Sequence, residues 1–147
     1  MATVITTNND HWSFHREFVA KPAAASVVLR ELLSNLERLQ WPAKDVYSVH
    51  LAVEEALANS IFHGSDNSDS NAIRVEFGLS RTELRIAIED DGKGFDVAQL
   101  ADPTSPERAE LPSGRGVFLM RTYMDSVEYN QKGNRVTMVK VASACVE

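Results

Sequence analysis

The sequence predicts an α+β fold, a two-layer α/β sandwich in which helices lie on one face of a mixed, mainly antiparallel sheet. Two long segments with helical spacing of apolar residues follow one another in the first half of the chain. Shorter segments alternate between apolar and polar residues, and they occur in pairs joined by short turns, as in hairpins. Strands grouped in this way beside grouped helices are typical of α+β domains. The 147 residues are enough for one domain with a single hydrophobic core.

The first predicted elements are a strand and two helices. Apolar and aromatic side chains alternate with polar ones over 11–19, which predicts a strand. Pro22 favours the first turn of a helix, and apolar residues recur at helical spacing over 23–40. Pro42 ends that helix, and a second apolar stripe over 43–63 predicts the next one.

A hairpin is predicted after the second helix. Residues 65–71 are all polar, which indicates a loop. The segments 73–77 and 84–88 then alternate, and a short turn separates them. The second of these strands runs directly into Asp90, so the glycine-containing segment that begins there is expected at the end of a strand.

The last third of the chain predicts a long connection, a helix and a closing hairpin. The segment 95–113 contains three prolines and little periodicity, which indicates a mobile connection with one short helix near 97–100. A short helix is predicted over 117–124. The strands 126–130 and 135–141 are expected to pair as a hairpin.

Composition limits the class of protein. A net charge of −6 argues against a nucleic-acid partner, because binding to a phosphate backbone depends on Lys and Arg. Cys145 is the only cysteine, so no disulfide can form within the chain and a reducing compartment is expected. Residues 1–10 lack a signal-peptide pattern and are expected to be flexible, and no run of about 18 apolar residues could cross a membrane. We therefore expect one domain over 11–143 in a cytoplasmic protein without a membrane partner.

The second predicted helix carries three polar residues on one face. Glu55, Asn59 and His63 are spaced four positions apart, and each step of four rotates by only about 40° around a helix. The Asn59 carbonyl oxygen is a ligand type that Mg²⁺ accepts beside phosphates and water. Glu55 would then lie where it could act as a base or position a water near a terminal phosphate. The alternatives are a solvated Glu55–Asn59 pair and a His63 imidazole that only interacts with the helix end.

Asp90, Gly92 and Gly94 form a second motif, at the end of a predicted strand. A buried Asp90 carboxylate can accept a hydrogen bond from the exocyclic amine of adenine, and the glycines would let a base approach the backbone. Asp-Gly is also a common turn dipeptide, so a plain turn is the alternative. The chain continues into the long connection instead of a return strand, which favours the ligand-binding interpretation.

Gly114, Arg115 and Gly116 form a third motif, directly before the predicted helix over 117–124. Free N–H groups at a helix N-terminus favour anions such as phosphate. The motif is not a Walker loop, because no G-x-x-x-x-G-K-[ST] occurs in the chain. Together the three motifs indicate a nucleotide site.

In order and spacing, the three motifs resemble those of the GHKL ATPases, and within them the bacterial anti-sigma factor serine/threonine kinases. The run Glu55-x-x-x-Asn59-x-x-x-His63-Gly64 is similar to the N box of that family, and the two glycine motifs are similar to its two glycine boxes. The resemblance implies the Bergerat (histidine-kinase-like ATPase) fold, with Mg²⁺ and ATP as cofactors and an ATP lid over about 95–113. The roles that it implies are general base for Glu55, Mg²⁺ ligand for Asn59, adenine contact for Asp90, and nucleotide contacts for Asn59, His63, Asp90, Gly92, Gly94, Gly114, Arg115 and Gly116.

The chain departs from the family pattern at Pro112, where some members carry a basic residue that can reach the γ-phosphate. This departure leaves Arg108 or Arg115 as the candidate cation, since an arginine is well suited to the charge of a transferring phosphoryl group.

The resemblance also implies a function. It is that of an ATP-dependent serine/threonine protein kinase and anti-sigma factor, which phosphorylates an anti-anti-sigma (STAS-type) partner and sequesters a sigma factor. A homodimer is implied as well. The alternative is an ATP-binding regulatory module that switches partner binding without phosphoryl transfer.

Overall fold

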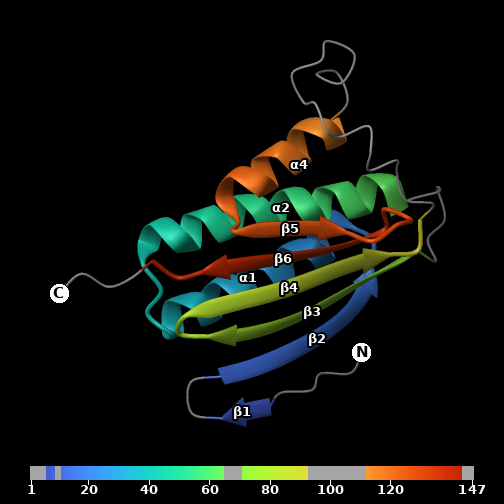
Figure 1. Cartoon of the computed structure of the whole chain (residues 1–147). Coiled ribbons are helices and arrows are strands. Elements are labelled where there is room, and N and C mark those ends of the chain that lie inside the picture. The colour runs from blue at the N-terminus through green and yellow to red at the C-terminus, as the bar shows by residue number, and fades with distance from the viewer. Residues whose placement is uncertain (1–5, 9–10, 65–70, 93–111, 144–147) are drawn as a thin grey trace.

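The described residues form one sheet with three helices against it (Figure 1). The computed structural model describes residues 6–8, 11–64, 71–92 and 112–143. Its sheet has the strand order β1-β2-β3-β4-β6-β5, and every neighbouring pair of strands is antiparallel. The strands are β1 (Thr6–Asn8), β2 (His11–Val19), β3 (Ala72–Ser80), β4 (Glu83–Asp90), β5 (Ser126–Tyr129) and β6 (Arg135–Val141). The helices are α1 (Pro22–Arg38), α2 (Ala43–Gly64) and α4 (Pro112–Tyr123).

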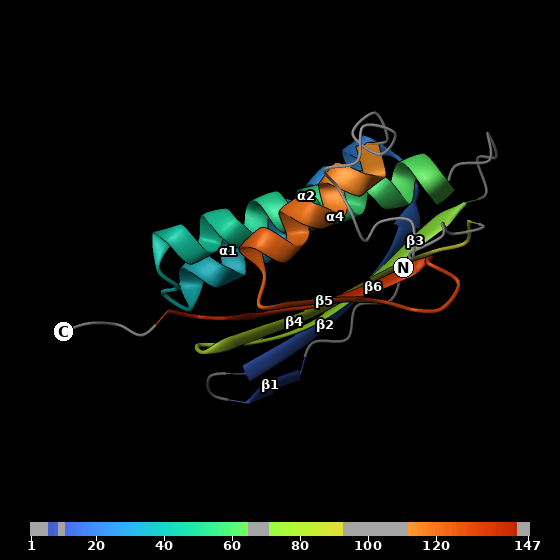
Figure 2. The ribbon, with the colours of Figure 1, turned by 45° about the horizontal axis from the view of Figure 1, so that its top comes forward.

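All three described helices lie on the same face of the sheet, as the turned view makes plain (Figure 2). The predicted fold class, α+β with helices on one face, is therefore confirmed. The hairpins predicted for β3–β4 and β5–β6 are also present. Because β6 inserts between β4 and β5, the last hairpin extends the sheet from β4 and lies under α4 (Figure 1).

Two elements differ from the sequence prediction. Helix α4 begins at Pro112 and not at residue 117, so Gly114 and Gly116 lie inside the helix and not in a turn before it. Proline is favourable in the first helical turn, where its missing N–H has no intrahelical partner to lose. Residues 6–8, inside the segment expected to be flexible, form β1 and pair with β2 from Thr6↔Ser13 to Asn8↔His11. The predicted loop 65–71, except Asn71, and most of the connection over 95–113, including its short helix at 97–100, lie outside the described residues.

The core lies between the sheet and the helices. In β3, the side chains of Ile73, Val75, Phe77 and Leu79 are at most 3% exposed and face the helices. The intervening Arg74 and Glu76 lie on the other face, as the period of two in a strand requires. Phe14 of β2 pairs in register with Phe77, and their ring centroids are 4.5 Å apart. This burial of large apolar side chains fixes the position of α2 against the sheet.

The connection between α1 and α2 is also fixed. Gln40 has a φ of 60°, and the Trp41 N–H donates to the Leu36 carbonyl at 3.0 Å, which is the pattern of a left-handed helix C-cap. The Trp41 indole Nε1 donates to the Ser80 carbonyl at the end of β3, at 2.9 Å. The start of α2 is therefore tied to the sheet.

A buried carboxylate joins the start of α2 to the end of the described chain. Asp45 lies in the first turn of α2 and is only 2% exposed. Its Oδ2 accepts a hydrogen bond from the Ser143 N–H at 2.7 Å, and its Oδ1 accepts one from the Ser143 hydroxyl at 3.0 Å. Hydrogen bonds to a charged acceptor are stronger than neutral ones, so they hold Ser143 against α2.

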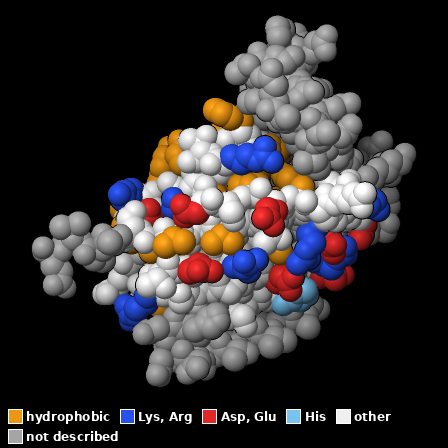
Figure 3. All heavy atoms as spheres, viewed as in Figure 1, with side chains coloured by type: hydrophobic (Ala, Val, Ile, Leu, Met, Phe, Trp, Pro, Cys, Tyr) orange, Lys and Arg blue, Asp and Glu red, His pale blue; other side chains and the backbone are white. Residues whose placement is uncertain are grey.

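Acidic and basic side chains are interspersed over the face seen in Figure 3, without a region of a single sign. None of the described helices is long and apolar enough to cross a lipid bilayer.

Candidate functional site

Glu55 and Asn59 lie where α2 and α4 approach each other closely. The point of approach is Gly116 of α4. A Cβ atom added there would lie 3.0 Å from Glu55 Oε2 and 3.1 Å from Asn59 Nδ2. Only a residue without a side chain leaves these two polar groups undisturbed. The first and third sequence motifs are therefore in contact in the folded chain.

The Asn59 side chain is buried but not fully paired. The residue is 8% exposed, and its Nδ2 atom has no hydrogen-bond partner among the described residues. A buried donor without a partner costs about 1–3 kcal/mol. Such a cost is unusual in a well-packed helix layer and is typical of groups that bind a ligand. Glu55, one turn earlier, is half-buried.

Asp90 ends β4 and is 5% exposed. Its Oδ1 accepts a hydrogen bond from the Gly92 N–H at 2.8 Å, so the Asp-Asp-Gly segment does form a turn. Asn134 holds the Asp90 backbone on both sides: the Asp90 N–H donates to the Asn134 carbonyl at 2.9 Å, and Asn134 Nδ2 donates to the Asp90 carbonyl at 2.8 Å. The carboxylate is thus fixed at the edge of the sheet.

Arg74 holds the residues on either side of Asp90. Its Nε donates to Glu89 Oε1 at 3.0 Å, and its Nη2 donates to Asp91 Oδ1 at 2.9 Å. The hydrogen bond from Arg74 lowers the pKa of the Asp91 carboxyl below its ordinary value. The end of β4 is therefore held by its neighbouring strand.

Asn59 and Asp90 line the same narrow pocket, between α2 and the ends of β4, β5 and β6. The second motif therefore joins the first at one site. The residues lining the pocket are Ala56, Asn59, Ser60, Ile88, Asp90, Tyr129, Gly133, Asn134 and Val136.

Of these lining residues, only Asn59 and Asp90 were predicted as site residues. Among the others, three belong to the last hairpin: Tyr129, Gly133 and Asn134. They come from the end of β5 and from the β5–β6 turn. Gly133 has a φ of 80°, and Asn130 Oδ1 accepts hydrogen bonds from the N–H groups of Gly133, Asn134 and Arg135 at 2.8, 3.0 and 3.2 Å. The sequence signals a turn here, but only the position of β6 beside β4 brings that turn to Asp90.

The side chain of Tyr129 is partly buried and lines the same pocket as Asn59. It donates a hydrogen bond to Met120 Sδ at 3.9 Å. Burial raises its pKa well above the ordinary value for tyrosine, and the Asn59 side chain acts in the opposite direction. Tyr129 is therefore neutral throughout the physiological pH range.

Other predicted residues lie partly or wholly outside what the structure describes. Gly94 and Arg108 lie outside the described residues, and the side chains of His63 and Arg115 are not described. Gly114 lies in the first turn of α4.

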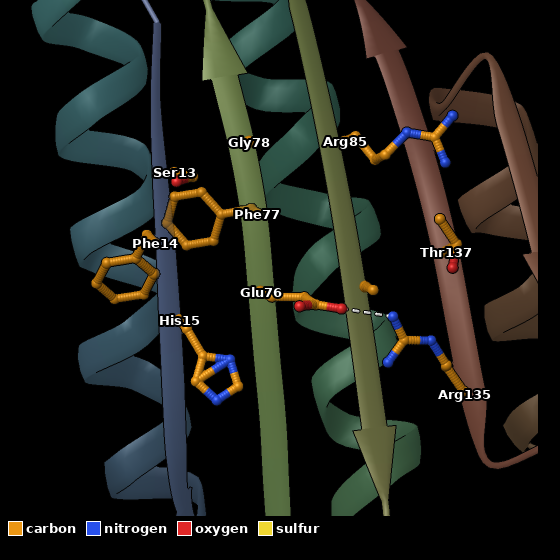
Figure 4. A pocket seen from close by; sticks show the side chains of 10 residues that line it. Ser13, Phe14, His15, Glu76, Phe77, Gly78, Arg85, Arg135 and Thr137 are labelled. Atoms are coloured by element: carbon orange, nitrogen blue, oxygen red, sulfur yellow. Dashed lines mark hydrogen bonds and ion pairs between the residues drawn. The ribbon is translucent and has the colours of Figure 1, made fainter. Parts of the chain in front are cut away.

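The larger hollows of the described molecule are elsewhere. One, of about 390 Å³, is a shallow groove on the sheet face opposite the helices (Figure 4). An ion pair between Arg135 Nη2 and Glu76 Oε1, 2.6 Å long, crosses β4 over the buried Ala87 at one end of this groove. Another, of about 400 Å³, lies between α1 and α2 and is mostly apolar. Neither contains a residue predicted to bind the nucleotide, so size alone does not locate the site.

The helix layer on one face of an antiparallel sheet defines a protein domain of the α+β class. Residues 18–140 match the model of the histidine kinase-like ATPase domain. The chain belongs to this family.

Curated relatives agree with this assignment. The chain is 33% identical over 129 residues to an anti-sigma F factor of Clostridium botulinum (strain Eklund 17B / Type B), with 84% of this chain and 90% of the relative covered. It is 30% identical over 128 residues to the serine-protein kinase RsbW of Oceanobacillus iheyensis, with 82% of this chain and 81% of the relative covered.

A solved structure shows the same fold. The crystal structure of RsbU and RsbW domains from Mycobacterium tuberculosis superposes with a TM-score of 0.60 at 16% identity. The match covers 90% of this chain and 33% of that chain.

Gly116→Ala is expected to weaken nucleotide binding while changing the stability of the fold only slightly. Alanine gains about 1 kcal/mol of helix propensity over glycine, but the new Cβ must displace Glu55 and Asn59 by a few tenths of an ångström. We expect the free energy of unfolding to change by less than about 1 kcal/mol and the affinity for Mg·ATP to fall about tenfold. Denaturant unfolding and nucleotide titration measure the two effects.

The matched control is Thr122→Ala, on the exposed side of the same helix, where the hydroxyl donates only to the Phe118 carbonyl. It should leave the nucleotide affinity unchanged. Equal affinities for Gly116→Ala and Thr122→Ala would show that the close contact at Gly116 has no bearing on binding.

Proposed function

We propose that this chain is an ATP-dependent serine/threonine protein kinase and anti-sigma factor, which phosphorylates an anti-anti-sigma (STAS-type) partner and sequesters a sigma factor. The observation that carries the proposal is the buried Asn59 amide, which shares one pocket with Asp90 and lies with Glu55 against Gly116. The names of the curated relatives, an anti-sigma F factor and a serine-protein kinase, support it.

The residues fit Mg·ATP. Asn59 offers an amide oxygen, and its side chain is buried beside Glu55 at the close approach of Gly116. Mg²⁺ typically takes one or two protein oxygens and completes its shell with phosphates and water. The Asp90 carboxylate accepts from the Gly92 N–H, and because a carboxylate has about four lone-pair sites it can also accept from the adenine amine. Mg·ATP supplies the phosphoryl group that is transferred.

Different residues of this chain have different roles in phosphoryl transfer. Glu55 accepts the proton of the serine or threonine hydroxyl of the partner, and Asn59 holds the metal. The glycine positions 92, 94, 114 and 116 keep side chains away from the nucleotide, and His63 and Arg115 contact its phosphates. Arg108 or Arg115 offsets the charge that develops at the γ-phosphate. Positioning and charge compensation are sufficient for phosphoryl transfer.

The proposal extends to the localisation, the oligomeric state and the domain organisation of the protein. It acts in the cytoplasm as a homodimer, through one domain over 11–143 with an ATP lid over about 95–113. Neither a membrane nor a nucleic acid is a direct partner.

Two measurements on the purified chain test the proposal. Mg·ATP at about 100 times its Kd should stabilise the fold by about 2.7 kcal/mol, because it binds the folded state alone. Labelled γ-phosphate should then appear on a serine or threonine of a STAS protein from the same cell. Stabilisation without transfer to any STAS protein would favour the regulatory module that switches partner binding. No stabilisation over a wide range of ATP would exclude both.

A further inference from the structure

The Asn59 carboxamide has two different ends, and only one of them can serve a metal. Its carbonyl oxygen is a ligand for Mg²⁺, whereas its amino group can only donate hydrogen bonds. If the amide turned by half a rotation, an N–H would point at the cation. A residue that accepts a hydrogen bond from the Asn59 amino group would therefore keep the Asn59 carbonyl oxygen directed at Mg²⁺.

Tyr129 is placed to hold that end. It lines the same pocket as Asn59, and its ring packs against the hydrophobic core. Its position is set by pairing with Val136 of β6 and by the hydrogen bond from its hydroxyl to Met120 Sδ. Met120 lies one helical turn beyond Gly116, the residue that contacts the Asn59 amide. The Tyr129 hydroxyl is thus tied to α4 near the place where Gly116 approaches the Asn59 amide.

The donors and acceptors at this point are complementary. Asn59 Nδ2 is a buried donor without a partner among the described residues. A tyrosine hydroxyl that donates its proton to Met120 can still accept hydrogen bonds through its oxygen.

We propose that Tyr129 is a positioning residue for metal binding: its hydroxyl oxygen accepts a hydrogen bond from Asn59 Nδ2 and turns Asn59 Oδ1 toward Mg²⁺. The inference rests on the proposed function, since it needs Asn59 to be the metal ligand. It adds a residue on β5 that none of the three sequence motifs contains.

Tyr129→Phe tests the inference, because phenylalanine fills the same core space and lacks only the hydroxyl. The matched control is Tyr123→Phe, a half-buried tyrosine of α4 whose ring meets Tyr47 edge-on at 6.5 Å. The measurement is the binding of a fluorescent ATP analogue over a series of Mg²⁺ concentrations, with circular dichroism to confirm folding.

We expect Tyr129→Phe to raise the Mg²⁺ concentration at half-saturation about fivefold, to leave metal-free nucleotide binding unchanged, and to leave the Tyr123→Phe control at the wild-type value. A role in packing alone would lower the midpoint of unfolding without moving the Mg²⁺ dependence. An unchanged Mg²⁺ half-saturation in folded Tyr129→Phe would overturn the inference while leaving the proposed kinase function in place. Wild-type protein that binds no nucleotide at any Mg²⁺ concentration would overturn both.

A second measurement needs no variant. In the wild-type protein with Mg·ATP, the side-chain amide protons of Asn59 should exchange slowly with solvent in an NMR experiment, because one of them is hydrogen-bonded to the Tyr129 hydroxyl oxygen. Exchange as fast as that of an exposed side-chain amide, such as that of Gln131, would contradict the hydrogen bond.

Discussion

Glu55→Gln is expected to lower phosphoryl transfer at least about a hundredfold and to leave the affinity for Mg·ATP within about twofold of wild type. Glutamine has nearly the same shape as glutamate but cannot accept a proton at neutral pH. Its amide also keeps the contact with Gly116 free of added bulk, so the packing of α2 against α4 is preserved. Single-turnover transfer of labelled phosphate to a STAS partner measures the rate, and nucleotide titration measures the affinity.

The neighbouring residue supplies a matched control. Glu54 is exposed, and its Oε2 lies 3.1 Å from His50 Nε2 on the outer side of α2. Glu54→Gln removes the same charge one position away and should transfer phosphate at the wild-type rate. Normal transfer by Glu55→Gln would remove Glu55 from its role as base.

Asp90→Asn should lower the affinity for Mg·ATP about a hundredfold and weaken the preference for adenine. Asparagine keeps an oxygen for the Gly92 N–H, so the turn after β4 is retained. Its amino group then replaces the oxygen that accepts from the adenine amine, which brings two donors face to face. The same amino group could donate to the carbonyl oxygen of guanine, so the ratio of ATP to GTP affinity is the most direct measurement.

The control is Asp91→Asn, which removes the same charge from the adjacent exposed position. It weakens the hydrogen bond from Arg74 and leaves the Asp90 side chain unaltered. Asp91→Asn should retain both the affinity and the preference. An Asp90→Asn variant that binds ATP as tightly as wild type would rule out the adenine contact.

The sequence was sufficient for the fold class and for the face of α2 that carries the site. Period-two alternation identified β3 and β4, and spacing by four identified Glu55 and Asn59 as neighbours on one helix face. The curated relatives are named as anti-sigma factor and serine kinase, as the resemblance implied. The fold class, the site face of α2 and the resemblance could be predicted because they depend on local periodicity and on short sequence motifs.

The parts that sequence could not predict depend on contacts between distant segments. No local pattern indicates that β6 inserts between β4 and β5, and this arrangement alone brings Tyr129 and Asn134 to Asp90. The helical start at Pro112 was overlooked because the two glycines after it lower helix propensity. Packing of α4 against α2 compensates for that cost, and Gly116 is what makes the close approach possible.

The hydrogen bonds between Asp45 and Ser143 fix a position from which energy transfer to a bound nucleotide can be measured. They fix the last described residue at the beginning of α2, and Asn59 lies fourteen positions farther along that helix, about 21 Å away at 1.5 Å per residue. Cys145, the only cysteine, follows two positions after Ser143. Two residues of chain span at most about 7 Å, so a thiol-reactive dye on Cys145 would lie within energy-transfer range of a labelled nucleotide.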